Sequence, residues 1–598
     1  MECKEYLERY RKKLSAEIER LQDRELPAFT KEAYQEYFQN GNRVSFEKIY
    51  FGRREFLTDY GVWVIINQKP GMETMVKRLL DIVSEILSEP TWVLPAHGSM
   101  KHFEGEAVCI DLFAAETAGS IAEILALLDK HPAVKEDQEC KESYVCVKHA
   151  FWEAFQVRIL SVFQKANPCD WWEYGNMNWS SVCAGNVGIA VYYLYKMGFM
   201  TEEELIQTTI RVSKSMKSYL LSMGEDGACA EGVGYYQYGM QYYLAWDELL
   251  HDFMQEKCPE IESVDIHKLA MFLPKVALGG GNYVNFSDCL LQNPIKMGIL
   301  AYLASRYPDV SVPKDYCDGE RLQFSDWTEF MGGSECHRFA GALRDYLWIE
   351  RYGEDLQKEE GSLEVAVFPE HMWYIRKFEN GISFFAKGGN NDEPHNHNDV
   401  GSIAYMVNGE EVLCDLGSGE YVKDYFNENR YRFLCNCSLG HNVPILGTEG
   451  NGQQLAGAEC CADFFYADRN GMEVHFGKAY GKASGEAVCR TVTCNDQGDF
   501  EIRDHVDVAL CGQKKGSYTE SFVSKLEPVI EGHQVRFYLQ QEQNKGRYVV
   551  LSFVEEQVEK PEIEKLDFTD HTGKRIEVYR VFAVAKGTVA RMYLACSR

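Results

Sequence analysis

The sequence predicts a multidomain α+β protein: a helical N-terminal part, built as layered helical hairpins or a toroid, followed by a C-terminal antiparallel β-sandwich. The chain has 598 residues, which exceeds the roughly 250–300 residues at which a single hydrophobic core stops growing. Apolar residues recur at helical spacing before about residue 350 and at strand-like spacing after about residue 364. We therefore expect a helical domain over residues 1–350 and a β-sandwich domain over residues 351–598.

The first part of the chain shows apolar side chains that return every three or four residues, as on one face of a helix. Clear examples cover residues 75–87, 121–128, 187–194 and 205–220. Many helices of similar length with short connections favour helical hairpins packed in layers or in a ring.

The last part of the chain contains short alternating or β-branched runs bounded by turn residues. Examples cover residues 381–385, 403–407, 412–415 and 535–539. Asn408-Gly409 separates two of these runs and is a strong hairpin signal. We expect these strands to form an antiparallel β-sandwich of several layers.

The composition limits the classes of ligand that we expect this protein to bind. The formal net charge is −29, and no cluster of Lys and Arg is present, so a nucleic-acid partner is not expected. An acidic surface also repels polyanions at long range, so an anionic ligand needs a locally basic or metal-assisted cleft. Aromatic residues make up 13% of the chain, and such side chains fill cores but also stack on sugar rings.

The N-terminus alternates charged and apolar residues, unlike a signal peptide. No run of about 18 uncharged apolar residues suggests a membrane span. The 20 cysteines are scattered, many in apolar runs, which is typical of reduced thiols. We expect a cytoplasmic protein with no membrane partner, although a processed or truncated exported form would look identical. A homodimer is the default expectation for its assembly.

A polar window between strand-like runs contains His395, His397 and Asp399 at alternate positions. In an extended segment these side chains share one face, so either histidine could bind a metal. Asp415 and His441 follow later strand-like runs and could complete a zinc site of two imidazoles and one carboxylate. The alternative is that each is a hydrogen-bonded turn residue.

Two segments of the helical part also carry polar and aromatic groups. Asn178 and Trp179 begin an apolar helix, where Asn could simply cap the helix. Glu231, Tyr235 and Tyr238 lie in a segment rich in glycine and tyrosine. Glycines allow a backbone to approach a ligand closely, whereas an aromatic stripe alone is more typical of a core.

In their order along the chain, these motifs resemble the heparinase II/III-like polysaccharide lyases. The resemblance covers most of the chain and is more specific than any one motif. It rests on Asn178-Trp179, the segment from Glu231 to Tyr235, the segment from His395 to Ser402, Val412 to Asp415, and His441-Asn442-Val443, with Trp92 to His97 and Asp111 to Ala118 as further similar segments.

The resemblance implies an incomplete (α/α) toroid followed by an antiparallel β-sandwich, and β-elimination at a uronic acid. In that reaction a base takes the C5 proton, the carboxylate is neutralised, and an acid protonates the oxygen that leaves C4. By motif position, Asn178 corresponds to the neutralising residue, His395 to the base and Tyr235 to the acid, which can also act as the base for one C5 configuration. Tyr236 and Tyr238 are close competitors for the last role.

The resemblance also implies a structural Zn²⁺ site formed by His397, Asp415 and His441. It further implies substrate contacts, for which the candidates are Trp179, Glu231, Tyr238, Asn390, Tyr421 and Arg430.

The implied substrate is an anionic oligosaccharide that contains uronic acid, with glycosaminoglycan types such as heparan sulfate, chondroitin or hyaluronan first. Without a signal peptide, exolytic cleavage of imported oligosaccharides is expected. Three alternatives stay open: a uronate C5-epimerase on the same scaffold, a lyase for alginate or exopolysaccharide oligosaccharides, and a non-catalytic carbohydrate-binding protein.

Overall fold

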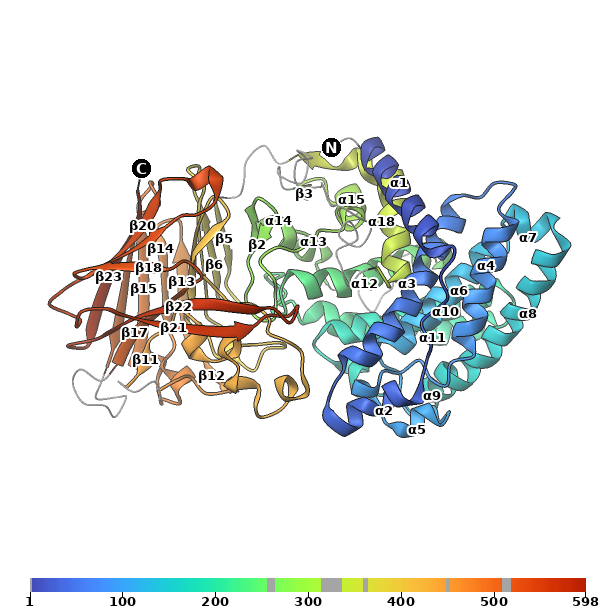
Figure 1. Cartoon of the computed structure of the whole chain (residues 1–598), viewed down its shortest axis with the longest axis horizontal. Helices are drawn as coiled ribbons and strands as arrows, with labels where there is room; N and C mark the ends of the chain where they lie inside the picture. The colour runs from blue at the N-terminus through green and yellow to red at the C-terminus, as the bar shows by residue number, and fades with distance from the viewer. Residues whose placement is uncertain are drawn as a thin grey trace.

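The computed structural model describes residues 3–254, 264–312, 336–358, 364–447, 452–507 and 518–597. Helices gather on one side of the molecule and β-sheets on the other (Figure 1). The predicted fold class is confirmed: an incomplete (α/α) toroid precedes an antiparallel β-sandwich. The last long helix ends at Tyr352, and the sandwich strands start at Val365.

The toroid is built from amphipathic and fully buried helices. The longer ones are α1 (Cys3–Leu21), α2 (Lys31–Asn40), α3 (Val44–Ile66), α4 (Glu73–Leu87), α6 (Leu112–Leu128), α8 (Gln138–Phe155), α10 (Asn178–Lys196), α11 (Glu202–Leu221), α12 (Val233–Met254), α15 (Met297–Arg306) and α18 (Phe339–Tyr352). Helix α10 packs against α6, α11 and α12, so it lies inside the ring. Most of its side chains are buried, in accord with its apolar sequence. No helix in the described parts of the chain combines the length and apolar character needed to cross a membrane.

The sandwich has three main antiparallel sheets. A five-stranded sheet has the order β10-β9-β7-β6-β5, an eight-stranded sheet the order β13-β14-β15-β16-β23-β20-β19-β18, and a four-stranded sheet the order β11-β17-β22-β21. The five-stranded sheet comprises β5 (Val365–Phe368), β6 (Trp373–Lys377), β7 (Ile382–Lys387), β9 (Ile403–Val407) and β10 (Glu410–Leu413).

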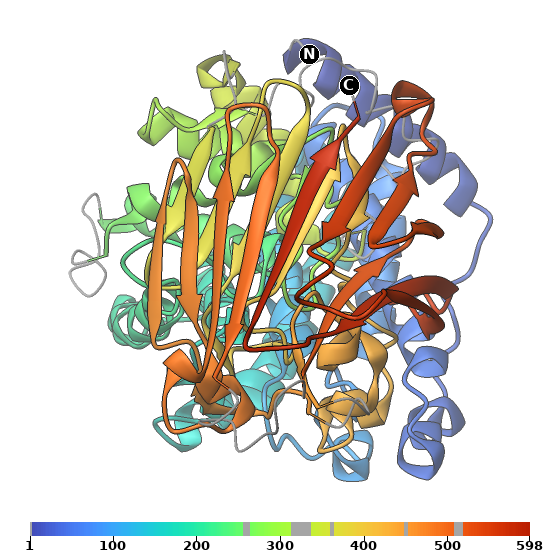
Figure 2. The same ribbon diagram turned by 90° about the vertical axis from the view of Figure 1, so that its left-hand side faces the viewer.

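The other strands are β11 (Ile445–Leu446), β13 (Phe464–Asp468), β14 (Gly471–His475), β15 (Val488–Cys494), β16 (Phe500–Val506), β17 (Tyr518–Ser524), β18 (Pro528–Glu531), β19 (Gln534–Tyr538), β20 (Tyr548–Phe553), β21 (Glu562–Thr569), β22 (Arg575–Val584) and β23 (Val589–Cys596). Figure 2 shows the eight-stranded sheet in front, with the five-stranded sheet and the helices behind it.

The five-stranded sheet is the middle layer of the molecule. Trp373 and Ile375 of β6 belong to the helical core, whereas Tyr374 between them belongs to the core shared with the outer sheet. This follows from the alternation of side chains along a strand. Because both faces are covered, every residue of β6 and β7 is buried. The loop between β7 and β9 contacts the helical part where the ring of His395 stacks on Tyr235 of α12.

Candidate active site

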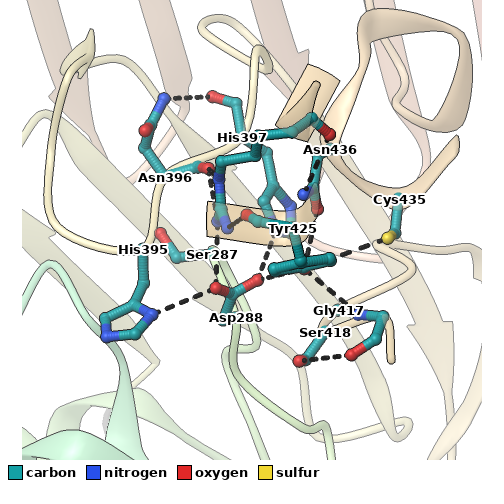
Figure 3. Close-up of polar contacts among 12 residues, drawn as sticks. Ser287, Asp288, His395, Asn396, His397, Gly417, Ser418, Tyr425, Cys435 and Asn436 are labelled. Carbon is teal, nitrogen blue, oxygen red and sulfur yellow. Dashed lines mark hydrogen bonds and ion pairs between the residues drawn. The ribbon is translucent and has the colours of Figure 1, made fainter. Parts of the chain in front are cut away.

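Asp288 lies between two histidines of the polar window (Figure 3). Its Oδ2 lies 3.0 Å from His395 Nδ1, and its Oδ1 lies 3.0 Å from His397 Nε2. Arg430 Nη2 donates to Oδ2 at 2.9 Å, and the Tyr425 hydroxyl donates to Oδ1 at 2.5 Å. One buried carboxylate thus joins a loop of the helical part to the sandwich.

The Asp288 carboxylate is stabilised in its ionised form. Burial alone raises its pKa, but hydrogen bonds from His395 and His397 and the charge of Arg430 outweigh burial. The net effect holds the pKa of Asp288 well below its ordinary value.

The loop that carries Asp288 is fixed on both sides by side-chain hydrogen bonds. Asn285 Nδ2 donates to the carbonyl of Asp415 at 3.2 Å, and Ser287 Oγ donates to the carbonyl of Ala230 at 3.1 Å. The neighbouring Cys289 contacts two glycine positions closely. A Cβ on Gly232 would lie 2.6 Å from Cys289 Cβ, and one on Gly417 would lie 2.6 Å from the Cys289 carbonyl oxygen.

Both glycines have positive φ, 89° and 65°, so glycine is required there for conformation as well as for space. Two non-glycine residues at the junction also have positive φ: Ser287 at 64° and His395 at 59°. The backbone N–H of Asp288 donates to the His395 carbonyl at 3.2 Å, which helps to hold this conformation. Strained backbone of this kind is concentrated at functional sites.

Tyr235 lies in the first turn of α12 and stacks on His395, with ring centroids 4.1 Å apart. Its hydroxyl is 2.7 Å from the Tyr421 hydroxyl, which is 3.5 Å from His395 Nδ1. Burial, and then the negative charge of Asp288, raise the pKa of Tyr235 above its ordinary value. The phenol therefore stays protonated at neutral pH and can donate a proton.

The two competing tyrosines have other contacts. Tyr236 is buried and donates to the Leu269 carbonyl at 2.8 Å. Tyr238 is buried beneath the guanidinium of Arg338, 3.7 Å from its ring centre. Tyr235 is the tyrosine of this segment that stacks on His395.

Glu231 connects Asn178 to His395. Its Oε1 accepts from the backbone N–H of Asn178 at 3.0 Å, so a carboxylate from a distant segment caps helix α10. Its Oε2 is 3.7 Å from His395 Nε2. Burial raises the pKa of Glu231 from 4.5 to about 7, and the charge of His395 and the Asn178 N–H only partly oppose it. Asn178 is itself buried. The alternative prediction that Asn178 caps α10 is wrong, because Met177 is at the N-cap position and makes no side-chain hydrogen bond there.

Trp179 continues from Asn178 into an aromatic wall. Its ring contacts Trp171 and His97 with centroid distances of 5.1 and 4.9 Å. His97 Nδ1 lies 2.9 Å from Asp111 Oδ2, which fixes the imidazole. Trp171 is 55% exposed, so the wall reaches solvent.

The three predicted zinc ligands are close together and buried. His441 Nδ1 lies 3.3 Å from Asp415 Oδ2, and the rings of His397 and His441 have centroids 5.2 Å apart. His397 Nδ1 is a buried atom without a hydrogen-bond partner among the described residues, whereas the buried His441 Nδ1 and Asp415 Oδ2 face each other in the 3.3 Å contact. Two imidazole nitrogens and a carboxylate oxygen form a donor set that suits Zn²⁺, so the residues fit the metal.

Asp399 is a second carboxylate beside these histidines. One ligand atom each from His397, Asp399 and His441 lie within 4.8 Å of one another. Asp399 Oδ1 is also 2.9 Å from Lys387 Nζ, and both side chains are fully buried. Asp399 is therefore a second candidate for the carboxylate ligand beside the predicted Asp415, which is not among the side chains grouped within this distance.

The remaining predicted substrate contacts divide into two groups. Tyr421 and Arg430 lie beside His395 and Asp288, as described above. Asn390 lies in the short strand β8 (Asn390–Asn391), and its side-chain oxygen accepts from the Asp392 N–H at 2.9 Å. For all six residues a substrate contact stays a prediction.

Asp288 is not among the site residues that the sequence predicts. It lies in an ordinary polar loop after Asn285, and its partners are more than a hundred positions away in the chain. No local spacing signals such a contact. An aspartate between a Gly-rich turn and an apolar helix was the available signal, but it is equally typical of a solvent-exposed loop.

Several solved structures share the architecture of nearly the whole chain. The fold matches a heparinase III crystal structure with a TM-score of 0.59 at 12% identity, covering 96% of this chain and 79% of that one. A second heparinase III structure gives a TM-score of 0.56 at 14% identity, with coverage of 98% and 88%. Heparan sulfate lyase HepC from Pedobacter heparinus gives 0.57 at 10% identity, with coverage of 99% and 88%.

No protein-family model matches the sequence, and a search of curated proteins finds no match either. At this low identity the likeness concerns the fold. The chain therefore shares the toroid-and-sandwich fold of heparinase III and heparan sulfate lyase along nearly its whole length.

Proposed function

We propose that this chain is a lyase that cleaves glycans containing uronic acid by β-elimination. The observation that carries the proposal is the contact between His395 and Tyr235, with Glu231 and the start of α10 beside them. A base, an acid and an amide that can bind a carboxylate are the groups that the reaction requires.

In the proposed reaction, Nε2 of His395 takes the C5 proton of the uronic acid. The electron pair of that C–H bond forms the C4–C5 double bond, and the bond from C4 to the glycosidic oxygen breaks. The Tyr235 hydroxyl gives its proton to the leaving oxygen. The raised pKa of Tyr235 supports the role of acid, because a phenolate base would need the opposite shift.

The amide of Asn178 is proposed to donate hydrogen bonds to the uronate carboxylate, which stabilises the charge that develops when C5 loses its proton. Its position supports this role, since Glu231 holds the first residue of α10 beside His395. Trp179, Tyr421 and Arg430 are proposed to contact the sugar rings and their substituents.

His397, Asp415 and His441 would hold Zn²⁺ through the three buried atoms described above. A bound Zn²⁺ would supply charge and a fixed geometry to the loop, which is a structural role. His441 Nε2 lies 2.9 Å from the Cys435 carbonyl, an arrangement in which Nε2–H donates and Nδ1 would be the nitrogen available to a metal.

The substrate is proposed to be a short glycosaminoglycan-type oligosaccharide, cleaved from its end inside the cell. The charge balance supports a short substrate. The chain carries a net charge of −29, and the cations of the site are already paired, Arg430 with Asp288 and Lys387 with Asp399. A long polyanion would meet repulsion that these paired cations do not offset.

A panel of uronate oligosaccharides in deuterated water tests the reaction type. Elimination produces a conjugated double bond that absorbs in the near ultraviolet. An epimerase would instead incorporate deuterium at C5 without this absorbance, and a binding protein would retain the intact oligosaccharide with neither change. Absorbance with at least one substrate supports the proposal; either of the other outcomes across the panel contradicts it.

A further inference from the structure

The Asp288 carboxylate contacts both the proposed base, His395, and the proposed metal ligand His397. Among the described contacts, it is the only group that links these two side chains directly. Oδ2 faces His395 Nδ1 and Oδ1 faces His397 Nε2, each at 3.0 Å. The side chain of Asp288 has no solvent exposure. Figure 3 shows both rings directed at this one group.

The hydrogen positions follow from the chemistry of the pair. Arg430 Nη2 at 2.9 Å supplies a permanent positive charge, so the carboxylate is ionised and can only accept hydrogen bonds. Each imidazole nitrogen that faces it must then carry the hydrogen. In a neutral imidazole the other nitrogen is left without hydrogen, as a base or a metal ligand.

The free nitrogens point to two different tasks. Nε2 of His395 lies 3.7 Å from Glu231 Oε2, on the side of Asn178. Nδ1 of His397 is buried without a hydrogen-bond partner, on the side of His441. The contacts with Asp288 therefore leave two nitrogens without hydrogen: the one needed for proton abstraction and the one needed for metal binding.

We propose that Asp288 is the positioning residue that sets the tautomers of both His395 and His397, and so couples the base to the metal site. This rests on the proposed function for the role of His395, but the tautomers themselves are properties of the chain. Neither histidine can rotate its ring or exchange tautomer without losing its hydrogen bond to a buried, ionised carboxylate, which is costly.

The first test needs no substitution at Asp288. Nitrogen-15 NMR of protein labelled at histidine reports which ring nitrogen carries hydrogen, and His395→Gln and His397→Gln assign the two signals. The proposal expects hydrogen on Nδ1 of His395 and on Nε2 of His397. The opposite tautomer at either ring overturns it.

The second test compares Asp288→Asn with Tyr425→Phe. The asparagine has the same shape but one amide donor, which must face one of the two rings in place of an acceptor. Tyr425→Phe removes a different hydrogen bond to the same carboxylate without altering either imidazole contact. Circular dichroism and thermal unfolding establish that each variant is folded.

For Asp288→Asn, kcat should fall by about 10²- to 10⁴-fold with KM within about threefold, as when the orienting carboxylate of a catalytic histidine becomes an amide. Zinc affinity, measured by chelator competition with Zn²⁺ alone, should weaken by about 10- to 100-fold. Tyr425→Phe should change both quantities less than about fivefold. A folded Asp288→Asn protein with kcat and zinc affinity within threefold of the wild type contradicts the coupling.

The outcomes separate this proposal from the proposed function. If the wild type eliminates no uronate substrate, the lyase assignment fails, while the NMR tautomers and the zinc titration still decide the role of Asp288. If the wild type does not bind zinc, the metal half of the coupling is wrong, whatever the activity.

Discussion

His395 and Tyr235 stack with ring centroids 4.1 Å apart and planes inclined by 17°. His395 comes from a loop of the sandwich and Tyr235 from the first turn of α12, so this contact joins the two parts of the chain. The groups proposed as base and acid are therefore in place without substrate. Pre-positioned groups of this kind lower the entropic cost of reaching the transition state.

Removal of the Tyr235 hydroxyl should abolish proton donation while the stacked ring remains. We expect Tyr235→Phe to lower kcat by about 10²- to 10⁴-fold, the usual contribution of a general acid. Tyr236→Phe is the matched control: it loses a buried hydrogen bond to Leu269, so the free energy of unfolding should fall by about 1 kcal/mol while kcat stays within about threefold. Steady-state kinetics on both variants checks this. A larger loss of kcat in Tyr236→Phe than in Tyr235→Phe would show that Tyr235 is not the acid.

The two histidines of the polar window should separate in their effects. His395→Ala should remove activity and leave zinc affinity within about threefold, because Asp288 keeps its contact with His397 when the His395 ring is removed. His397→Ala should lower zinc affinity by several orders of magnitude, since one of three ligands is lost. Zinc titration and kinetics on both variants measure the difference. Equal loss of metal and activity in the two variants argues against this division of roles.

Glu231 should make stability depend on pH. Its pKa of about 7 in the folded protein lies above the 4.5 of an unperturbed glutamate, so the folded chain keeps a proton that the unfolded chain loses. Stability contributed by this group is present in full below pH 4.5 and is lost as the pH rises to about 7, by roughly 3 kcal/mol in total.

Glu231→Gln should lack this dependence. Urea unfolding at pH 5 and pH 8 measures the free energy of unfolding of both proteins. Between the two pH values, this free energy should rise by about 2–3 kcal/mol in the variant relative to the wild type. Glu542→Gln, a change at a side chain that is 86% exposed, serves as the control and should show no such gain. Parallel pH profiles for Glu231→Gln and the wild type would contradict the raised pKa.

Arg490 should be critical for the sandwich beneath the metal ligands. It forms a fully buried ion pair with Asp504 at 2.6 Å and donates to the carbonyls of Gly401 and Asn442. Arg490→Met leaves a buried carboxylate unpaired and should lower the free energy of unfolding by about 3–5 kcal/mol. The double variant with Asp504→Leu should recover a large part of that loss. Denaturant unfolding tests this, and an additive further loss in the double variant would show that the pair does not act as a unit.

Much of the fold could be predicted from periodicity alone. Buried helices such as α10 and the alternating strands of the sandwich have the apolar spacing of their elements, because burial decides both. The order of the layers could not be predicted in this way. Strand β6 is buried on both faces, so its sequence lacks the alternation that would distinguish an inner sheet from an outer one.

The site was predictable where its residues form local motifs. Asn178, Tyr235 and His395 lie in three such segments, and the structure links them through Glu231 and a ring contact. Asp288 was not predictable, since its role comes entirely from contacts that are distant in sequence. The capping of α10 by Glu231 could not be predicted for the same reason.

The central claim is that His395 removes a proton from a uronic acid and thereby causes elimination. The most direct test is the near-ultraviolet absorbance of uronate oligosaccharide mixed with wild-type protein and, in parallel, with folded His395→Ala. We expect a steady rise in absorbance with the wild type and a rate at least about 10²-fold lower with the variant. Equal rates for the two proteins, or no rise with the wild type on any uronate oligosaccharide, would contradict it.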